Sequence, residues 1–454
     1  MKWWFLALLC FGIVFSYSAS APAEPVDSQI WQDQVRARDD RIADLEQKME
    51  VLADELANVR TQVAVPEEKS LKSIYGFGPA ASKIYGLERG LSIGGYGEGY
   101  YTNFIGDSRS ATTSVGGIPV AGQALDRSDF LRLVMYLGYK FTDKIIFNSE
   151  IEFEHATTEG TASAGGGSVS VEFASLDFLF RPELNARVGL LLLPMGFLNE
   201  IHEPPFFHGV QRPETELRIL PSTWRENGAG IFGKLTETLE YRAYVVTGFN
   251  ARGFSAAGIR GGRQQGDRAF AEDIAFVGRL DWTPLPEWLF GGSLYIGDSG
   301  QDQTLGGVSI PDTGVVMGEL HGQYRKGPFE ARALLALSKL SDARALTLAL
   351  DLPATAPIAE RMLGGYVEVA YDIWSMLFGG DNYLAPFIRV EYVDTQAEVP
   401  SGFSELGLNQ YWVFTPGLTF KPHPNVVLKV EYRNFAPRAG EKPDELSFGM
   451  GFAF

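Results

Sequence analysis

Cysteine is almost absent from this chain of 454 residues, and the one cysteine, Cys10, lies close to the amino terminus. It falls in a segment that carries one positive charge, runs apolar from Phe5 to Phe15 and ends in small residues. This pattern predicts a cleaved secretory signal peptide over residues 1–23. Without Cys10 the mature chain has no thiol, so disulfides, thiolate metal sites, iron–sulfur clusters and c-type haem are excluded.

Two further deficits narrow the class of protein. Beyond the signal segment no stretch is apolar for the about 20 residues that a membrane-spanning helix needs. Basic residues are outnumbered, 39 Lys and Arg against 56 Asp and Glu, so no basic face is available to bind nucleic acid. Glycine (51 residues) and aromatic residues (13%) are abundant instead. An exported chain of this composition is typical of a transmembrane β-barrel in the cell outer membrane.

Residues 28–65 carry a heptad pattern that predicts a long α-helix. Two series of apolar side chains, three positions apart, each recur every seven residues, which is the seam of a left-handed coiled coil. We therefore expect a periplasmic coiled-coil stalk, followed by a linker over residues 66–89. A single amphipathic helix lying on the barrel or the membrane is the alternative. The seam consists of Val35, Ile42, Leu45, Met49, Leu52, Leu56, Val59 and Val63.

From Gly90 to Phe454 the hydrophobic period changes to two, which is the period of a β-strand. Short turns alternate with long polar connections, as in barrels that have tight periplasmic turns and long external loops. We predict an all-β fold, a transmembrane 16-stranded antiparallel β-barrel over residues 90–454, preceded by the periplasmic α-helical coiled coil. The strands are expected near 90–104, 128–141, 144–156, 168–181, 185–194, 227–235, 238–250, 271–283, 288–297, 313–326, 328–341, 361–375, 383–395, 408–421, 425–435 and 444–454.

The alternation also assigns one face of each strand to lipid and the other to the barrel interior. A charge on the lipid face would cost about 2–4 kcal/mol at the membrane midplane, so charged positions must face inward. Because sixteen strands enclose more volume than their side chains can fill, we expect a water-filled lumen. Charged faces of a soluble sandwich are the alternative. The predicted lumen wall contains Arg132, Glu150, Glu152, Arg187, Arg242, Glu319, Glu368, Arg389 and Glu391.

The long connection over residues 194–226 differs from the others because it is rich in large apolar side chains as well as charges. Such side chains gain nothing in water, so we expect the connection to fold into the barrel and narrow the pore. Charges at a narrow, low-dielectric constriction set ion selectivity. A loop that caps the barrel or contacts another subunit is the alternative. The candidate constriction residues are Glu200, His202, Glu203, Arg212, Glu214, Glu216, Arg218, Arg225 and Glu226.

Catalytic and metal chemistry have little support in the sequence. His202 and His208 lie six positions apart among prolines, without the spacing of metal ligands. No nucleophile–base motif occurs, so we predict no metal, no cofactor and no enzymatic activity. The Gly- and Arg-rich stretch 258–268 lacks the strand–turn–helix frame of a phosphate-binding loop. It is interpreted as a flexible surface loop, or as a loop that contacts lipopolysaccharide phosphates.

The order of these features resembles bacterial general porins and, more narrowly, the phosphate-selective porin O/P family. The features that carry the resemblance are the amino-terminal helix, Gly-Gly-Tyr-Gly-Glu at 94–98, the segments 218–221 and 224–228, and the terminal Phe454. The resemblance implies a homotrimer in contact with outer-membrane lipid and lipopolysaccharide, with the helix in the periplasm. That family's phosphate selectivity is associated with a basic channel, whereas acidic and basic positions are balanced here.

The function predicted from these features is that of an outer-membrane porin. Small hydrophilic solutes and ions would diffuse passively through a water-filled barrel narrowed by the inward-folded connection 194–226, with neutral or mild cation preference. One alternative is a channel selective for phosphate, another anion or another solute. The other alternative is a mainly structural trimer that spaces the cell envelope.

Overall fold

The computed structural model describes residues 28–62, 72–106, 113–115, 118–120, 125–160, 166–380 and 382–454. The predicted signal peptide and residues 66–71 of the predicted linker lie outside these residues. The chain divides into two compact units, Met1–Thr61 and Gln62–Phe454. Each unit is described by itself.

The first unit contains one long helix, α1 (Ser28–Gln62). At about 1.5 Å per residue, its 35 residues extend for roughly 50 Å. The apolar seam is exposed where its side chains are described, from 37% for Val35 to 69% for Met49. None of the described helices is both long and apolar enough to be a membrane-spanning helix. Self-association of α1 stays a prediction.

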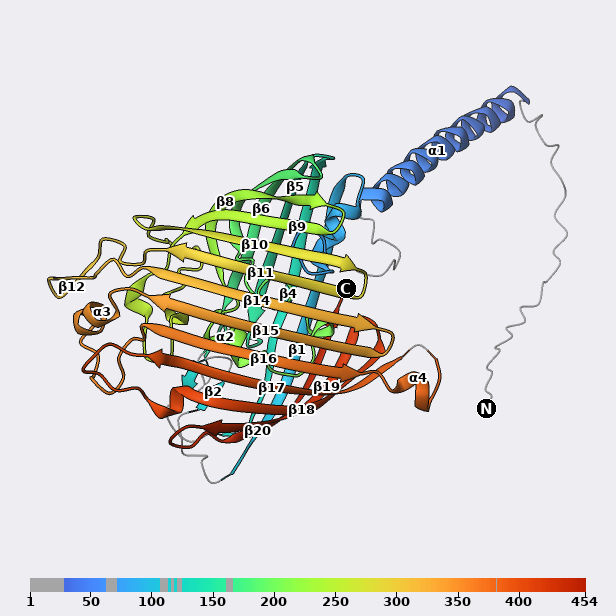
Figure 1. The fold of residues 1–454 in the computed structure, drawn as a ribbon. Coiled ribbons are helices and arrows are strands. Elements are labelled where there is room, and N and C mark those ends of the chain that lie inside the picture. Colours follow the sequence, from blue (N-terminus) through green and yellow to red (C-terminus); the bar gives the residue numbers. More distant parts are fainter. Residues whose placement is uncertain are drawn as a thin grey trace. The chain divides into compact units, whose positions relative to one another are not determined.

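The second unit is a closed barrel in which each strand is antiparallel to its neighbours (Figure 1). Its sixteen strands confirm the predicted all-β, 16-stranded antiparallel barrel, and each predicted strand corresponds to an observed one. The barrel strands are β1 (Gly90–Ile105), β4 (Arg127–Thr142), β5 (Ile145–Glu154), β6 (Val169–Arg181), β7 (Leu184–Leu192), β8 (Arg225–Thr236), β9 (Leu239–Thr247), β10 (Ile274–Leu285), β11 (Trp288–Gly297), β14 (Val315–Lys326), β15 (Phe329–Leu340), β16 (Arg361–Tyr371), β17 (Tyr383–Glu398), β18 (Gln410–His423), β19 (Val426–Pro437) and β20 (Asp444–Ala453).

The connections contain short elements that the period-two pattern did not predict. Two small hairpins are separate from the barrel sheet, because their strands pair only with each other. They are β2 (Thr113–Val115) with β3 (Ile118–Val120), and β12 (Thr304–Leu305) with β13 (Val308–Ser309). The short helices are η1 (Ala81–Gly86), η3 (Pro204–Phe206), α2 (Glu214–Arg218), η4 (Ala251–Gly253), η5 (Arg260–Gly262), α3 (Ala343–Ala349), α4 (Trp374–Leu377) and η6 (Gly407–Asn409).

The barrel closes where β1 pairs with β20. The terminal Phe454 donates its N–H to the Gly95 carbonyl (2.8 Å) and accepts from the Gly95 N–H (3.0 Å). A Cβ at Gly97 would lie 2.6 Å from the ring of Phe452. Glycine on the first strand therefore leaves room for the aromatic rings of the last strand at the closing pair.

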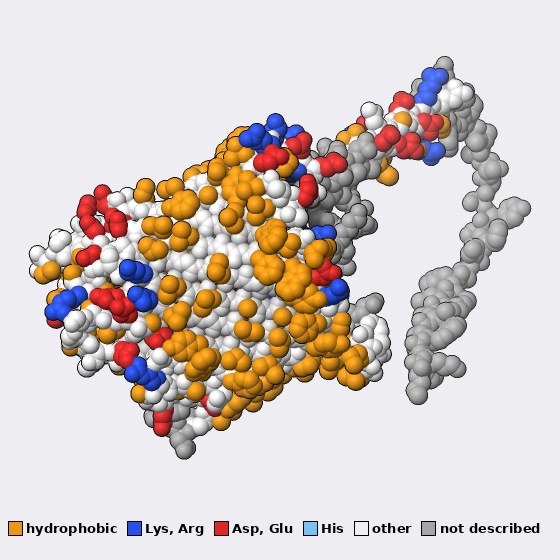
Figure 2. Space-filling model, in the orientation of Figure 1, with side chains coloured by type: hydrophobic (Ala, Val, Ile, Leu, Met, Phe, Trp, Pro, Cys, Tyr) orange, Lys and Arg blue, Asp and Glu red, His pale blue; other side chains and the backbone are white. Residues whose placement is uncertain are grey.

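The outer and inner faces of the wall differ as the alternation predicts. On β14, Val316 and Leu320 are 46% and 68% exposed, whereas Met317 and Glu319 between them are buried. Figure 2 shows the apolar side chains spread over the strands, with most charged side chains of the barrel gathered toward the strand ends. This distribution is the one that a lipid-embedded barrel requires.

Candidate functional site: the charged interior of the barrel

The predicted lumen wall is buried in this structure. None of its nine residues is more than 7% exposed, and Arg389 and Glu391 are fully buried. These side chains are covered rather than exposed to an open lumen in this structure. The sequence argument counted only the side chains of the strands as interior filling, whereas two other segments also pack against the wall. The water-filled lumen stays a prediction.

The wall residues form ion pairs along and across the strands. Arg389 on β17 contacts Glu391 at 2.8 Å and Glu368 of β16 at 3.2 Å. Arg132 on β4 contacts Glu152 of β5 at 2.8 Å. The four remaining wall groups also have partners: Arg187 with Asp177, Arg242 with Glu200, Glu319 with His321, and Glu150 with His202. Paired in this way, the charges can be buried without the large penalty of an isolated ion.

The first segment that packs against the wall is the connection 194–226. Its helix α2 lies against β16 and β17. Glu216 of α2 accepts a hydrogen bond from the Tyr366 hydroxyl on β16 (2.6 Å). Glu214 contacts Arg433 on β19 (2.5 Å), accepts from Tyr411 on β18 and pairs with Arg218 within α2. The candidate charges of this helix thus contact side chains of three strands, β16, β18 and β19.

The connection begins and ends in a buried apolar cluster. Trp224, just before β8, is fully buried and stacks on Phe249 with ring centroids 4.5 Å apart. Its backbone N–H donates to the Asn199 side chain (2.7 Å), which joins the two ends of the connection. Glu226, on β8, accepts from the backbone N–H of Gln264 (2.8 Å) and so contacts the Gly- and Arg-rich stretch.

His202 occupies a carboxylate pocket that the sequence did not reveal. Its Nε2 lies 3.1 Å from Glu172 on β6 and 3.4 Å from Glu150 on β5. These three buried residues are a group whose ligand atoms could hold a metal ion. Arg225 also contacts Glu172, at 3.1 Å, so the pocket already contains basic side chains that balance its carboxylates. Glu172 was not among the predicted site residues. The alternation along a strand indicates which face a residue occupies, but not which side chains of other segments lie beside it.

His208 lies elsewhere and shares no partner with His202. Its Nδ1 is 3.1 Å from the Thr419 hydroxyl on β18. Burial, followed by nearby Arg332, lowers the pKa of His208 to about 3, so this imidazole is neutral. Glu200 and Glu203, which flank His202 in the sequence, have separate partners: Glu200 pairs with Arg242, and Glu203 accepts from the backbone N–H of Ala80.

Arg212, Arg260 and Arg263 form a basic cluster, and none of them makes an ion pair with a carboxylate among the residues that the structure describes. Arg260 donates to the Ser222 carbonyl, and Arg263 donates to the carbonyls of Pro221 (3.3 Å) and Ser222 (2.9 Å). Arg212 Nη2 is buried without a hydrogen-bond partner. Burial, followed by the positive charge of Arg263 and Arg212, lowers the pKa of Arg260 well below its usual value. This cluster is the part of the interior best suited to attract an anion.

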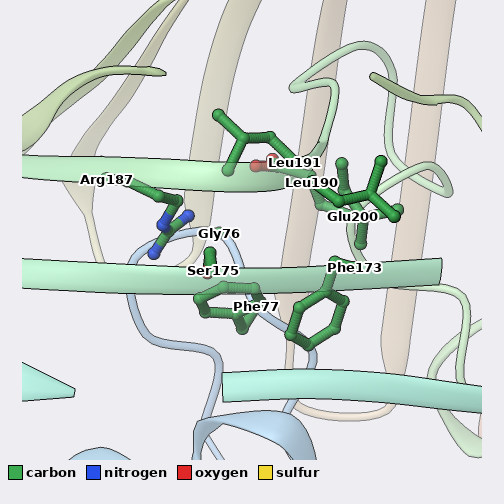
Figure 3. Close-up of a pocket in the computed structure, with 9 residues that line it drawn as sticks. Gly76, Phe77, Phe173, Ser175, Arg187, Leu190, Leu191 and Glu200 are labelled. Carbon is green, nitrogen blue, oxygen red and sulfur yellow. The ribbon is translucent and has the colours of Figure 1, made fainter. Parts of the chain in front are cut away.

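The second segment within the wall is residues 72–89, from the predicted linker. Figure 3 shows Phe77 and Gly76 beside Phe173, Ser175 and Arg187 of the wall. The cavity between them has a volume of about 10 Å³, room for about one water molecule. A hydrophilic solute therefore has no space between this segment and these wall residues.

Comparison with known proteins gives one close relative. No family model matches the chain. An uncharacterized protein of Aquifex aeolicus (strain VF5) is 38% identical over 383 residues, which cover 82% of each chain.

Solved structures give distant likenesses at the level of the fold. A loop L8 deletion mutant of the outer-membrane protein OmpT of Vibrio cholerae has a TM-score of 0.49 at 9% identity, over 81% of this chain and 100% of that one. The outer-membrane channel DcaP of Acinetobacter baumannii has a TM-score of 0.49 at 11% identity, over 80% and 97%. An anion-selective porin from Comamonas acidovorans has a TM-score of 0.49 at 12% identity, over 81% and 100%.

Proposed function

We propose that this chain, which belongs to the same family as the uncharacterized Aquifex aeolicus protein, is an outer-membrane channel for small hydrophilic solutes and ions. The observation that carries the proposal is the contrast between the two faces of the barrel. The outer face is apolar, while the inner face is lined by ionisable side chains from nearly every strand. Lipid is the solvent that fits the outer face, and water with its solutes fits the inner one.

The charged interior is hard to explain as a device for stability. Replacing a buried ion pair by well-packed apolar residues is often neutral or stabilising. A barrel that served only as a spacer could therefore have an apolar interior. Charges that are costly to bury become useful when the interior is hydrated during transport, because they interact with ions and replace part of their hydration.

The connection 194–226 is proposed as the constriction of this channel. Its acidic and basic residues contact wall residues of opposite sign, including Glu200 with Arg242 and Glu214 with Arg433. With both signs present, we expect neutral to mildly cation-preferring conductance. The proposed solutes are small, because a connection that contacts several strands would narrow the passage.

The proposed assembly is a homotrimer with α1 in the periplasm. The support is the exposed apolar seam of α1, in which Val35, Ile42, Leu45 and Met49 gain burial only by contact with another surface. A second copy of the same helix offers that surface at the matching heptad positions. The barrel surface would contact outer-membrane lipid and lipopolysaccharide.

A second candidate function, an anion-selective channel, is favoured by the basic cluster. Arg212, Arg260 and Arg263 have neutral partners or an unpaired nitrogen, so an anion could bind there without displacing a carboxylate. Replacing Arg260 and Arg263 by glutamine should then shift the reversal potential toward cation preference and remove any saturable block by phosphate. Unchanged reversal potentials would leave the less selective channel as the better description.

Planar-bilayer recording of the purified mature chain tests the proposed function. We expect discrete current steps, and a reversal potential under a salt gradient that gives the ion preference. A protein that inserts stably, as shown by heat-modifiable gel mobility, yet never conducts would overturn the proposal. The spacer function would then gain support if deletion of residues 28–63 weakened the envelope.

A further inference from the structure

The segment between the long helix and the first barrel strand lies against the inner face of the barrel wall. We call residues 72–89 the inner segment. Phe77, Ala80, Ala81, Ile84 and Leu87 are each at most 6% exposed. The 3-10 helix η1, which contains two of them, packs on β1, β4 and β5.

The inner segment is attached mainly through its backbone. Asn148 on β5 donates to the Ala81 carbonyl (3.0 Å), and Arg187 on β7 donates to the Tyr75 carbonyl (3.2 Å). The backbone N–H of Ala80 donates to Glu203 of the connection 194–226 (3.0 Å). Two further contacts link the segment to β4 and β6: Lys140 donates to the Leu87 carbonyl, and Tyr85 donates to Asp177.

These contacts do not make the segment a part of the barrel sheet. Its only described strand-like pairing is one bridge within the segment itself, between Ile74 and Phe77. The barrel ladder begins at Gly90, opposite Lys140. Withdrawal of the inner segment would therefore break its contacts with the side chains of the wall and leave all sixteen strand pairings of the barrel intact.

The wall that the segment covers carries apolar and polar groups. Phe173 and Ile146 cluster with the apolar side chains of the segment. Asn148, Asp177 and Arg187 also lie behind the segment, and none is more than 4% exposed. The part of the segment over residues 75–82 contains no acidic or basic side chain. This uncharged stretch covers polar wall groups of the kind that line a hydrated passage, and removal of the segment would expose them to water.

We propose that the inner segment is a displaceable plug, which holds the channel shut and opens it when withdrawn toward the periplasm. The proposal rests on the channel function proposed above. The plug follows α1 in the chain, separated from it only by residues 63–71. A force that displaces the helix would therefore reach the plug through the covalent backbone. In this proposal the helix controls the position of the plug and also carries the assembly surface.

A reversible disulfide lock tests the proposal. A Cβ placed on Gly138 of β4 would lie 3.2 Å from Ile84 Cβ, close to the separation that a disulfide requires. The mature chain is predicted to contain no other cysteine, so the variant I84C/G138C has a single possible pair. In planar bilayers we expect the oxidised variant to lose its openings and the reduced variant to regain them.

Matched controls keep the result specific. Each single-cysteine variant should conduct under both redox conditions. L320C/L335C joins directly opposed residues of β14 and β15 on the outer face, so its disulfide should leave the current unchanged. A third variant, with Gly and Ser replacing residues 75–87 at unchanged length, should conduct more than the wild type because the plug is lost.

The outcomes separate the plug from the channel. If oxidised and reduced I84C/G138C conduct equally, the passage does not run past the inner segment and the plug is refuted while the channel stands. If every variant inserts, including the Gly/Ser variant, and none conducts, the channel function itself fails. If the Gly/Ser variant does not fold, the disulfide pair still decides the question, because it changes only two buried side chains.

Discussion

Replacing Leu320 by arginine tests whether the outer face of the barrel is embedded in lipid. Leu320 lies near the middle of β14, is 68% exposed, and is opposed by Gly292 on β11 and Leu335 on β15. An arginine on the lipid face costs about 2–4 kcal/mol at the midplane and about 0–1 kcal/mol near the interfaces. Since about 1.36 kcal/mol is a factor of ten, Leu320→Arg should lower the folding equilibrium constant by about 30- to 900-fold.

The matched control is Val316→Arg on the same face of the same strand. Val316 is the second residue of β14, next to the strand end, and is 46% exposed. Urea titration of both variants in lipid vesicles, followed by tryptophan fluorescence and heat-modifiable mobility, gives the two free energies of unfolding. A large cost at Leu320 with a small cost at Val316 is expected. Equal costs at the two sites, or none at either, would refute a lipid-embedded barrel.

Three further predictions concern the interior of the barrel. Arg389→Met leaves two buried glutamate partners, Glu368 and Glu391, without their cation and should cost about 3–5 kcal/mol in urea titration. Replacing both partners by glutamine in the same chain should recover most of the loss. Trp224→Ala should cost about 3–5 kcal/mol, and Trp224→Phe much less, because the ring is fully buried on Phe249; similar values for the two variants would contradict the packing. For His202, outside the strands, burial lowers the pKa, but its two carboxylate neighbours outweigh burial and raise the pKa to about 9. The pKa of His202 in the folded protein is above its unfolded value of about 6.5. Its contribution to the free energy of unfolding should therefore be complete below about pH 6.5 and lost as pH rises through about 9. The difference in this free energy between wild type and His202→Gln, measured at pH 6 and pH 10, should be smaller at pH 10.

The strands of the barrel could be predicted from the sequence because lipid requires apolar side chains on the outer face of every strand. A strand such as β14 must place Val316 and Leu320 outward and Glu319 inward, so a period of two is visible in the residues alone. The long final strand was predictable for the same reason. The hairpin β12–β13 was missed because its two-residue strands are too short to show any period.

The interior of the barrel was only partly predictable from the sequence, because no rule like the lipid requirement governs which interior residues contact one another. Alternation placed Glu150 and Arg389 inside but could not say what they contact. The carboxylate pocket of His202 joins the neighbouring strands β5 and β6 to the connection 194–226, a contact that no period in the sequence indicates. The inner segment was interpreted as a linker because its short run of glycine, alanine and proline has no period. Its burial depends on a cavity that exists only once sixteen strands have closed.

That closure has a consequence for how the protein is made. The hydrogen bonds between Gly95 and Phe454 join the first strand to the last residue of the chain. Until that residue has been delivered, β1 and β20 are two open sheet edges with unsatisfied backbone groups, which invite pairing with other chains. Pairing between strands that lie far apart in the sequence forms slowly during folding. The newly exported polypeptide must therefore be shielded from such pairing until β20 has joined β1 and completed the barrel.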